Sequence, residues 1–233
     1  MIRILSTTVP AVLEESGRFG GAASFVAPED LIAAHARRGS HGNRTLAGRV
    51  ALRLLLAHAL GEAPARARDI PVERTCERCG APHGRPRAPG VSLSGSTSED
   101  QVLVAVAAQE VQVGVDVQAL PTRLWPGFDA AVLHPRERTP RQAAGLPSAI
   151  AVWTRKEALL KAAGVGLQIN PSRIPLESRS ETGTTWWSTA RDAPEETRGL
   201  HVRDLPGAVP RAVAASAIVP VHDIDLASVL SAR

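Results

Sequence analysis

The stretch WTRKEALLKAAGVGL, from Trp153 to Leu167, begins with a pattern that predicts a helix. Trp153, Glu157 and Lys161 recur at intervals of four residues, which would place all three on one helical face. Ser148 before the stretch and the GVG sequence near its end indicate where this helix starts and stops. A Glu four residues before a Lys is also typical of an ordinary surface ion pair. The tryptophan on the same stripe favours a face that is not simply in water.

The same stretch holds the only lysines of the chain, Lys156 and Lys161, among 27 Lys and Arg residues. Ammonium is a compact point charge that can lose a proton when buried, whereas guanidinium is a flat fork that stays charged. A site that presents one cation to a phosphate, or that donates a proton, would therefore retain lysine. The alternative is chance in a chain whose composition is biased toward Ala, Arg, Gly and Pro.

VQVGVDVQ, residues 111–118, alternates strictly and predicts a strand with its valines toward a core. The other face would carry Gln112, Gly114, Asp116 and Gln118, with the last two side by side at a spacing of about 7 Å. We expect Gly114 to leave an open space beside Asp116. A carboxylate beside such a space predicts a site for a hard cation such as Mg²⁺. The alternative is a solvated strand face with an ordinary Asp.

The remaining elements form a mixture of helices and strands without regular alternation, which predicts the α+β class. NRTLAGRVALRLLLAHALG predicts a helix with Asn43 as N-cap and Gly61 as its stop. QVLVAVA, residues 101–107, predicts a strand, and its short link to VQVGVDVQ predicts a hairpin or a short crossover. Residues 128–145 show helical spacing interrupted by prolines, and TTWWST, GLHV and RAVAASAIV predict short strands after Gly166.

Composition narrows the classes of function. The chain has 233 residues, 44% hydrophobic and 21% charged, which is typical of globular proteins. Its net charge of +4 suits an anionic ligand or an acidic partner. A nucleic-acid binder ranks last, because the chain has no Tyr and only three Phe to stack on bases. We find no apolar run long enough for a membrane span and no signal peptide. We expect a cytoplasmic monomer with reduced cysteines.

Three further motifs, taken with the helix and the strand, resemble the 4′-phosphopantetheinyl transferases that activate carrier proteins of peptide and polyketide synthases. That family shows a G-[VI]-D-[VIL]-E strand followed by W-[ST]-x-K-E-A-x-x-K-x-x-G-x-G-L. This chain has GVDVQ and, 37 residues after Asp116, the stretch that begins at Trp153. Upstream, NRTLAGRVALR, GRPRAP and SLSGSTSEDQVLVAVA resemble the family's helix, basic loop and serine-containing strand. The resemblance covers about Arg44 to Leu167.

The resemblance implies a fold of two similar α+β halves related by a pseudo-twofold, with the active site in the cleft between them. We place the halves at residues 1–112, on the side of the coenzyme A nucleotide, and 113–233, with the metal and the catalytic helix. The implied reaction moves the phosphopantetheine arm of coenzyme A to a serine of an acidic apo acyl or peptidyl carrier protein. It depends on Mg²⁺ and releases adenosine 3′,5′-bisphosphate.

The resemblance also implies a role for each matching residue. Asp116, Gln118 and Glu157 would hold Mg²⁺, Glu157 would also take the serine proton, and Lys161 would stabilise or protonate the departing phosphate. The implied coenzyme A contacts are Arg44, Thr45, Arg85, Ser94, Lys156 and Lys161. For Lys156 a structural ion pair is the alternative to a phosphate contact.

Two positions depart from the family's pattern. Gln118 replaces the second acid of the strand motif, so its uncharged amide predicts a weaker metal site. Gly95 replaces the histidine of the serine–histidine–serine motif that is expected to bind a coenzyme A phosphate. Backbone N–H groups near Gly95, or the guanidinium of Arg44 or Arg85, could compensate. These departures leave a second hypothesis, a decayed homologue that binds coenzyme A or a carrier protein without turnover.

The run CERCGAPH carries a separate pattern of metal-ligating residues. Cys76, Cys79 and His83 have the spacing of a zinc knuckle, but a structural zinc usually has four ligands and a second pair. The alternative is a loop that delivers Arg85 to its site.

Overall fold

The computed structural model describes residues 1–76, 79–138, 145–181 and 184–231. The chain divides into two compact units. Unit 1 consists of Met1–Glu110 and Val219–Arg233, and unit 2 consists of Val111–Ile218. The boundary expected between residues 112 and 113 thus lies two residues from the division near Val111. The chain after Val219 lies in unit 1 and not in the second half, because the strand Val221–Asp223 pairs with the first strand of the chain.

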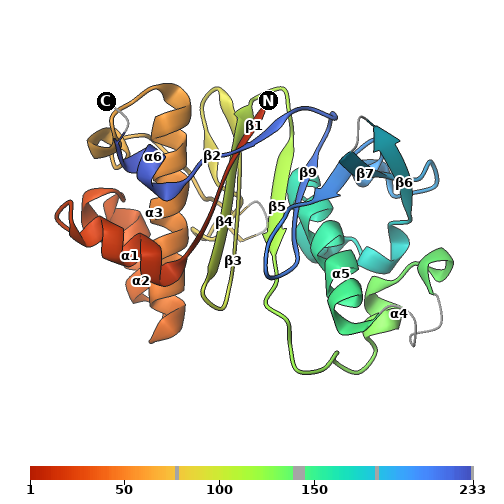
Figure 1. The fold of residues 1–233 in the computed structure, drawn as a ribbon. Helices are drawn as coiled ribbons and strands as arrows, with labels where there is room; N and C mark the ends of the chain where they lie inside the picture. Colours follow the sequence, from red (N-terminus) through yellow and green to blue (C-terminus); the bar gives the residue numbers. More distant parts are fainter. Residues whose placement is uncertain (77–78, 139–144, 182–183, 232–233) are drawn as a thin grey trace. The chain divides into compact units, whose positions relative to one another are not determined.

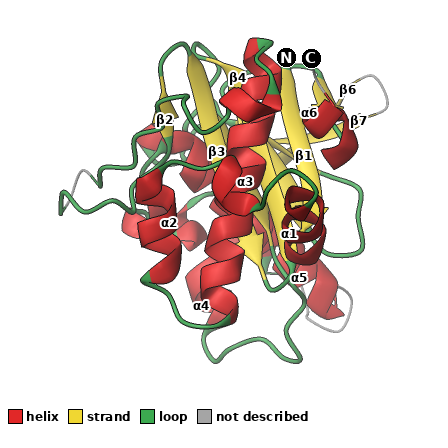
Figure 2. Cartoon of the chain, turned by 90° about the vertical axis from the view of Figure 1, so that its left-hand side faces the viewer, coloured by secondary structure: helices red, strands yellow, loops and turns green. Residues whose placement is uncertain are grey.

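Unit 1 is a five-stranded sheet with helices on one face, as Figures 1 and 2 show. The strand order is β10-β1-β4-β3-β2, and all neighbours are antiparallel except the parallel pair of β1 with β10. Its strands are β1 (Ile2–Thr8), β2 (Arg87–Ala88), β3 (Val91–Ser98), β4 (Gln101–Ala108) and β10 (Val221–Asp223). Its helices are α1 (Val9–Gly17), α2 (Pro28–His35), α3 (Ser40–Leu60) and α6 (Leu226–Ser231).

Helix α3 forms the centre of unit 1. Its eight residues from Val50 to Ala57 are all buried, so this part of the helix is covered on every side, by the sheet and by the other helices. It ends at Gly61, as expected, in the left-handed conformation at φ 73°. It begins at Ser40, a turn before the predicted N-cap Asn43, so that prediction was wrong.

Unit 2 is a second five-stranded antiparallel sheet, in the order β5-β9-β8-β7-β6. Helix α5 (Gly145–Ala163) packs against β5, β8 and β9, and α4 (Phe128–Val132) packs beside α5. The strands are β5 (Val113–Val117), β6 (Leu176–Glu181), β7 (Thr184–Thr189), β8 (His201–Asp204) and β9 (Arg211–Ala215). The three short strands expected after Gly166 are therefore present as β7, β8 and β9.

Of the two connections predicted between residues 101–107 and residues 111–118, a hairpin or a short crossover, the hairpin was wrong. These segments form β4 and β5, which belong to different sheets. Both edges of β4 are already paired, with β1 and with β3, and β5 pairs with β9. The short link therefore leads from one sheet to the other.

The mixed helices and sheets confirm the α+β class. In each sheet the first strand of the unit pairs antiparallel with a strand late in the same unit, β4 or β9, but β1 also pairs with β10 on its other side, whereas β5 lies at the edge of its sheet. Within the described residues, no helix is long and apolar enough to cross a membrane.

Candidate active site and its anion pocket

Gly114 on β5 lets the helix α5 lie directly on the strand. A Cβ atom at Gly114 would be 2.1 Å from the carbonyl oxygen of Ala158 and 2.3 Å from the amide nitrogen of Ala162. The expected open space beside Asp116 is therefore absent, because backbone of α5 occupies it. The close approach brings the side chains of α5 against Asp116, the next residue on the same buried face of the strand.

Asp116 and Lys161 form an ion pair across this contact. The Nζ atom of Lys161 donates to Oδ1 of Asp116 at 2.6 Å, and Nε2 of Gln118 donates to Oδ2 at 2.9 Å. Asp116 is buried, with 1% of its surface exposed, while the Lys161 side chain keeps 28% exposed. The strand carboxylate is thus fixed in position, and its cation can still reach a ligand from solution.

Glu157 lies one helical turn before Lys161 and adds a second carboxylate. The pKa of Glu157 is raised to about 7, mainly by burial and also by the charge of Asp116, while the charge of Lys161 opposes the change. Oε1 of Glu157 is buried without a hydrogen-bond partner among the described residues. A buried carboxylate oxygen without a donor is unfavourable unless a ligand satisfies it. Glu157 therefore lies close enough to Asp116 and Lys161 for their charges to affect its ionisation.

This donor set fits a hard divalent cation. Carboxylate and amide oxygens are the ligands that Mg²⁺ prefers, and it needs only one or two carboxylates besides phosphate oxygens and water. Glu157 supplies an oxygen without a partner. The oxygens of Asp116 accept hydrogen bonds from Lys161 and Gln118, and a carboxylate has about four lone-pair sites in all. Two carboxylates against one ammonium also leave an excess negative charge that a cation would neutralise.

Lys156 does not belong to this group of side chains. It is fully buried, and its Nζ atom donates to the carbonyl of Val132 at 2.7 Å and to Oε2 of Glu137 at 2.5 Å. Glu137 is held in turn by the backbone N–H groups of His134 and Leu176. The structure therefore contradicts the expected phosphate contact and gives Lys156 the structural role that was its alternative.

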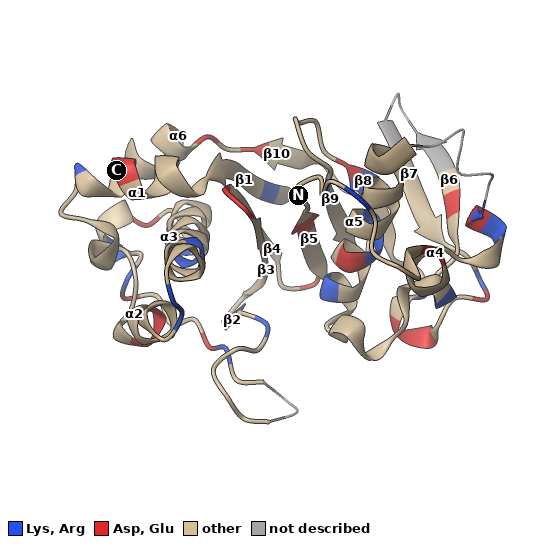
Figure 3. Ribbon diagram, turned by 90° about the horizontal axis from the view of Figure 1, so that it is seen from below, with Lys and Arg blue, Asp and Glu red and all other residues tan. Residues whose placement is uncertain are grey.

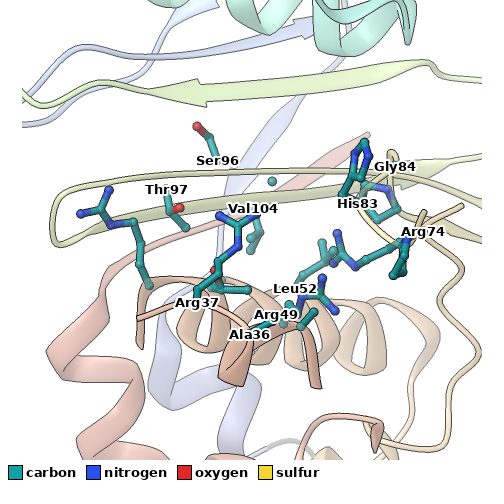
Figure 4. A pocket seen from close by; sticks show the side chains of 17 residues that line it. Ala36, Arg37, Arg49, Leu52, Arg74, His83, Gly84, Ser96, Thr97 and Val104 are labelled. Atoms are coloured by element: carbon teal, nitrogen blue, oxygen red, sulfur yellow. The ribbon is translucent and has the colours of Figure 1, made fainter. Parts of the chain in front are cut away.

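Unit 1 contains a separate cavity of about 480 Å³ with basic walls (Figure 4). Arg37, Arg44, Arg49 and Arg74 line it, from the end of α2, from α3 and from the loop that follows. Figure 4 shows Arg37, Arg49 and Arg74 with His83 around one space. The opposite wall comes from β3 and the loop before it. The other lining residues that carry or expose polar groups are Thr45, Gly48, Gly84, Gly95, Ser96 and Thr97.

A single buried carboxylate organises these guanidinium groups. Asp30 on α2 binds Arg49 at 2.6 Å and Arg53 at 2.5 Å, and Arg74 lies 3.9 Å away. Figure 3 shows basic positions on α3 and acidic positions on α2 in this part of unit 1. Arg53 is buried and also donates to backbone carbonyls. One carboxylate cannot neutralise three guanidinium groups, so the pocket keeps excess positive charge.

The unmet hydrogen-bonding capacity of the pocket also points to an anion. Nε of Arg44 and Nε of Arg74 are both buried without a hydrogen-bond partner among the described residues. Burial and the charge of Arg49 lower the pKa of Arg74 to about 10, and Asp30 opposes this. Arg74 therefore remains protonated at neutral pH. A phosphate group would provide acceptors for these donors, with the charge-assisted geometry that guanidinium favours.

The structure brings together only some of the residues expected to contact coenzyme A. Arg44 and Thr45 line the pocket, although the Thr45 hydroxyl donates to the backbone carbonyl of His41 at 2.9 Å. Arg85 and Ser94 do not line it; Nη2 of Arg85 contacts Ser92 Oγ at 3.4 Å, and Ser94 is buried.

Sequence reasoning missed three of the pocket arginines, Arg37, Arg49 and Arg74. Because the sequence is so rich in arginine, no sequence pattern distinguishes these three arginines from the other arginines of the chain. The informative residue was Asp30, whose burial cannot be read from its sequence neighbours.

The comparisons with known proteins bear on unit 2. Residues 112–209 match the family model described as the 4′-phosphopantetheinyl transferase superfamily (ACPS). The matched segment is less than half of the chain, and it contains β5 and α5 with Asp116, Glu157 and Lys161. No curated protein sequence matches the chain. Over this segment, the match supports the resemblance seen in the motifs.

Proposed function

We propose that the protein transfers the phosphopantetheine arm of coenzyme A to a serine of an apo acyl or peptidyl carrier protein. The observation that carries the proposal is the buried carboxylate of Glu157, with an oxygen that lacks a partner, next to the pair of Asp116 and Lys161. The family match over residues 112–209 supports it, because it includes all three residues.

The residues of unit 2 have complementary roles in this reaction. Asp116 and Glu157, with the amide of Gln118, would hold Mg²⁺, which supplies neutralisation of the negative charge on the pyrophosphate. Lys161, whose ammonium is partly exposed, would contact the phosphate that leaves with the nucleotide. Glu157 would accept the serine proton, directly or through water. The serine oxygen forms a new bond to phosphorus, and the bond to adenosine 3′,5′-bisphosphate breaks.

The basic pocket of unit 1 suits a nucleotide that carries phosphate groups. Adenosine 3′,5′-bisphosphate carries two phosphate groups, and the pocket offers Arg37, Arg44, Arg49 and Arg74 as donors. These guanidinium groups would replace the histidine that the family's pattern has at the position of Gly95. The net charge of +4 would also favour encounter with an acidic carrier protein.

The test is the intact mass of a purified apo-carrier protein after incubation with the enzyme, coenzyme A and MgCl₂. We expect a gain equal to one phosphopantetheine group and its loss when EDTA is present. Glu157→Gln should lower the rate by about two to four orders of magnitude, because it removes the proton acceptor and a metal ligand. Glu177→Gln, an exposed position on β6, is the matched control and should keep the wild-type rate.

Two results would overturn the proposal. The first is the absence of any mass gain across several acyl and peptidyl carrier proteins with folded enzyme. The second is an unchanged rate for Glu157→Gln.

A further inference from the structure

The loop between α3 and β2 brings three soft or borderline metal ligands close together. The Sγ atoms of Cys76 and Cys79 and a ring nitrogen of His83 all lie within 4.8 Å of one another. Sγ of Cys79 is 3.0 Å from Nε2 of His83. Ligands of one tetrahedral zinc, at about 2.3 Å for sulfur and 2.0 Å for nitrogen, are separated by roughly 3.5–3.8 Å. The three side chains therefore need only small movements to share an ion.

The backbone of the loop is folded to produce this grouping. The N–H of Cys76 donates to Ala81 O at 2.9 Å, and the N–H of Gly80 donates to Cys76 O at 2.8 Å. Gly80 has φ +71°, a left-handed conformation that favours glycine directly after the second cysteine. These bonds hold Cys76 next to Gly80 and Ala81, close to Cys79 and His83.

Two further contacts close the base of the loop. Glu73 and Arg87 exchange both backbone hydrogen bonds at 2.9 Å, and Gly84 N–H donates to Arg74 O at 2.7 Å. A Cβ atom at Gly84 would lie 2.3 Å from Thr75 O, so the two sides of the loop are in direct backbone contact. The loop is thus a defined structure and not a simple connection between α3 and β2.

Apolar burial does not explain why this loop keeps its shape. Cys79 and His83 are exposed and Cys76 is half-buried. In a small element with so little buried apolar surface, a metal ion supplies the stability that a core cannot. The cluster contains two thiolates and one imidazole, which select zinc over hard cations such as Mg²⁺.

We propose that Cys76, Cys79 and His83 bind a Zn²⁺ ion, with water as the fourth ligand, and that the ion fixes one wall of the basic pocket. His83 and Gly84 line that pocket, so a metal on His83 would hold this wall in place against Arg74 (Figure 4). On binding, each thiol loses its proton to solvent and His83 binds through one neutral ring nitrogen. This site differs from the Mg²⁺ site proposed in unit 2 in its residues, its ligand atoms and its metal.

The first experiment measures metal in the full-length protein, purified without added chelator, by mass spectrometry of the elements. We expect about one zinc per chain, and its loss in Cys76→Ser and Cys79→Ser. His222→Gln on β10 is the matched control, because this exposed histidine lies outside the cluster, and it should retain zinc. Replacement by Co²⁺ should give the thiolate-to-cobalt absorption band in the wild type and not in the cysteine variants.

A second measurement does not require any variant to fold. Zinc should slow alkylation of the two thiols by iodoacetamide by about tenfold or more, because the thiolate lone pairs are bound to metal, and EDTA should restore the rate. A protein that binds neither Zn²⁺ nor Co²⁺ under reducing conditions would overturn the proposal. So would a Cys76–Cys79 disulfide in the protein as isolated, or zinc loss in His222→Gln. None of these measurements uses coenzyme A or a carrier protein, so they stand apart from the proposed transferase activity.

Discussion

Each unit packs a long helix on a five-stranded sheet, but the charged side chains near this contact differ. In unit 1, one carboxylate, Asp30, neutralises only in part the arginines on α3 and in the loop that follows it. In unit 2, α5 places Glu157 and Lys161 near Asp116 of β5, so two carboxyl groups accompany one ammonium group. The first arrangement suits an anion and the second a cation. The packing of a helix on a sheet therefore does not determine the chemistry, which depends on a few side chains where the long helix meets the sheet.

The largest expected effects come from the two lysines of α5, whose replacement should change different properties: stability for Lys156 and activity for Lys161. Lys156→Met should lower the free energy of unfolding by about 3–5 kcal/mol, because it leaves the carboxylate of Glu137 inside unit 2 without its counter-charge. Lys161→Met should cost less stability, since this ammonium is 28% exposed, but it should abolish most of the transfer activity. Chemical denaturation and the carrier-protein assay measure the two effects.

A double variant provides the control for the buried pair. Lys156→Met combined with Glu137→Gln removes both charges and should recover part of the lost stability. If Lys156→Met is as stable as the wild type but inactive, Lys156 contacts the substrate and the structural role is wrong.

The next largest effect is expected when a glycine of unit 2, Gly114 on β5, is replaced by alanine, and the comparison is the same change at Gly95 on β3 of unit 1. Gly114→Ala should lower the free energy of unfolding by about 1–3 kcal/mol or more, because the new methyl group collides with the backbone of α5. It should also lower activity by moving Lys161 away from Asp116. At Gly95 the nearest atom to a new Cβ is Val104 Cγ1 at 3.5 Å, an ordinary contact, so Gly95→Ala should stay within about 0.5 kcal/mol. Equal thermal stability of the two variants would contradict this account of the β5–α5 contact.

The sequence predicted the site of unit 2 far better than the pocket of unit 1, for a physical reason. Asp116 and Lys161 are set by two regular local patterns, the alternation of a strand and the four-residue spacing of a helix. The pocket depends on Asp30 meeting Arg49 and Arg74, which lie 19 and 44 residues away in sequence, and no local period links them.

The wrong predictions have related causes. The hairpin between residues 101–107 and 111–118 was inferred from a short link, but the partners of β4 are chosen by the packing of β1 and β3. Gly114 was interpreted as an open space because a sequence shows that a side chain is missing but not what takes its place. Here the backbone of α5 takes it.

The third prediction tests the charge of the unit 1 pocket. Arg44→Met should weaken binding of adenosine 3′,5′-bisphosphate by about tenfold, or 1.4 kcal/mol, because it removes a buried donor that faces the cavity. Arg66→Met removes the same charge from the surface of unit 1, where Arg66 pairs with Asp69, and should leave affinity almost unchanged. Isothermal titration calorimetry compares the two. Equal losses would mean that net charge, and not the pocket, attracts the ligand.

The smallest expected effect is that of Gly95→His, the variant that restores the histidine of the family's pattern. Gly95 lines the pocket and has room for a Cβ atom, so Gly95→His should add a donor to a bound phosphate and tighten bisphosphate binding by roughly three- to tenfold. An imidazole with a pKa near 6.5 is charged below that pH, so the gain should be larger at pH 6 than at pH 8. Gly95→Ala controls for the added bulk. If Gly95→His and Gly95→Ala bind alike at both pH values, the arginines of α3 and its flanking loops already satisfy the phosphates, and the missing histidine has no energetic consequence in this chain.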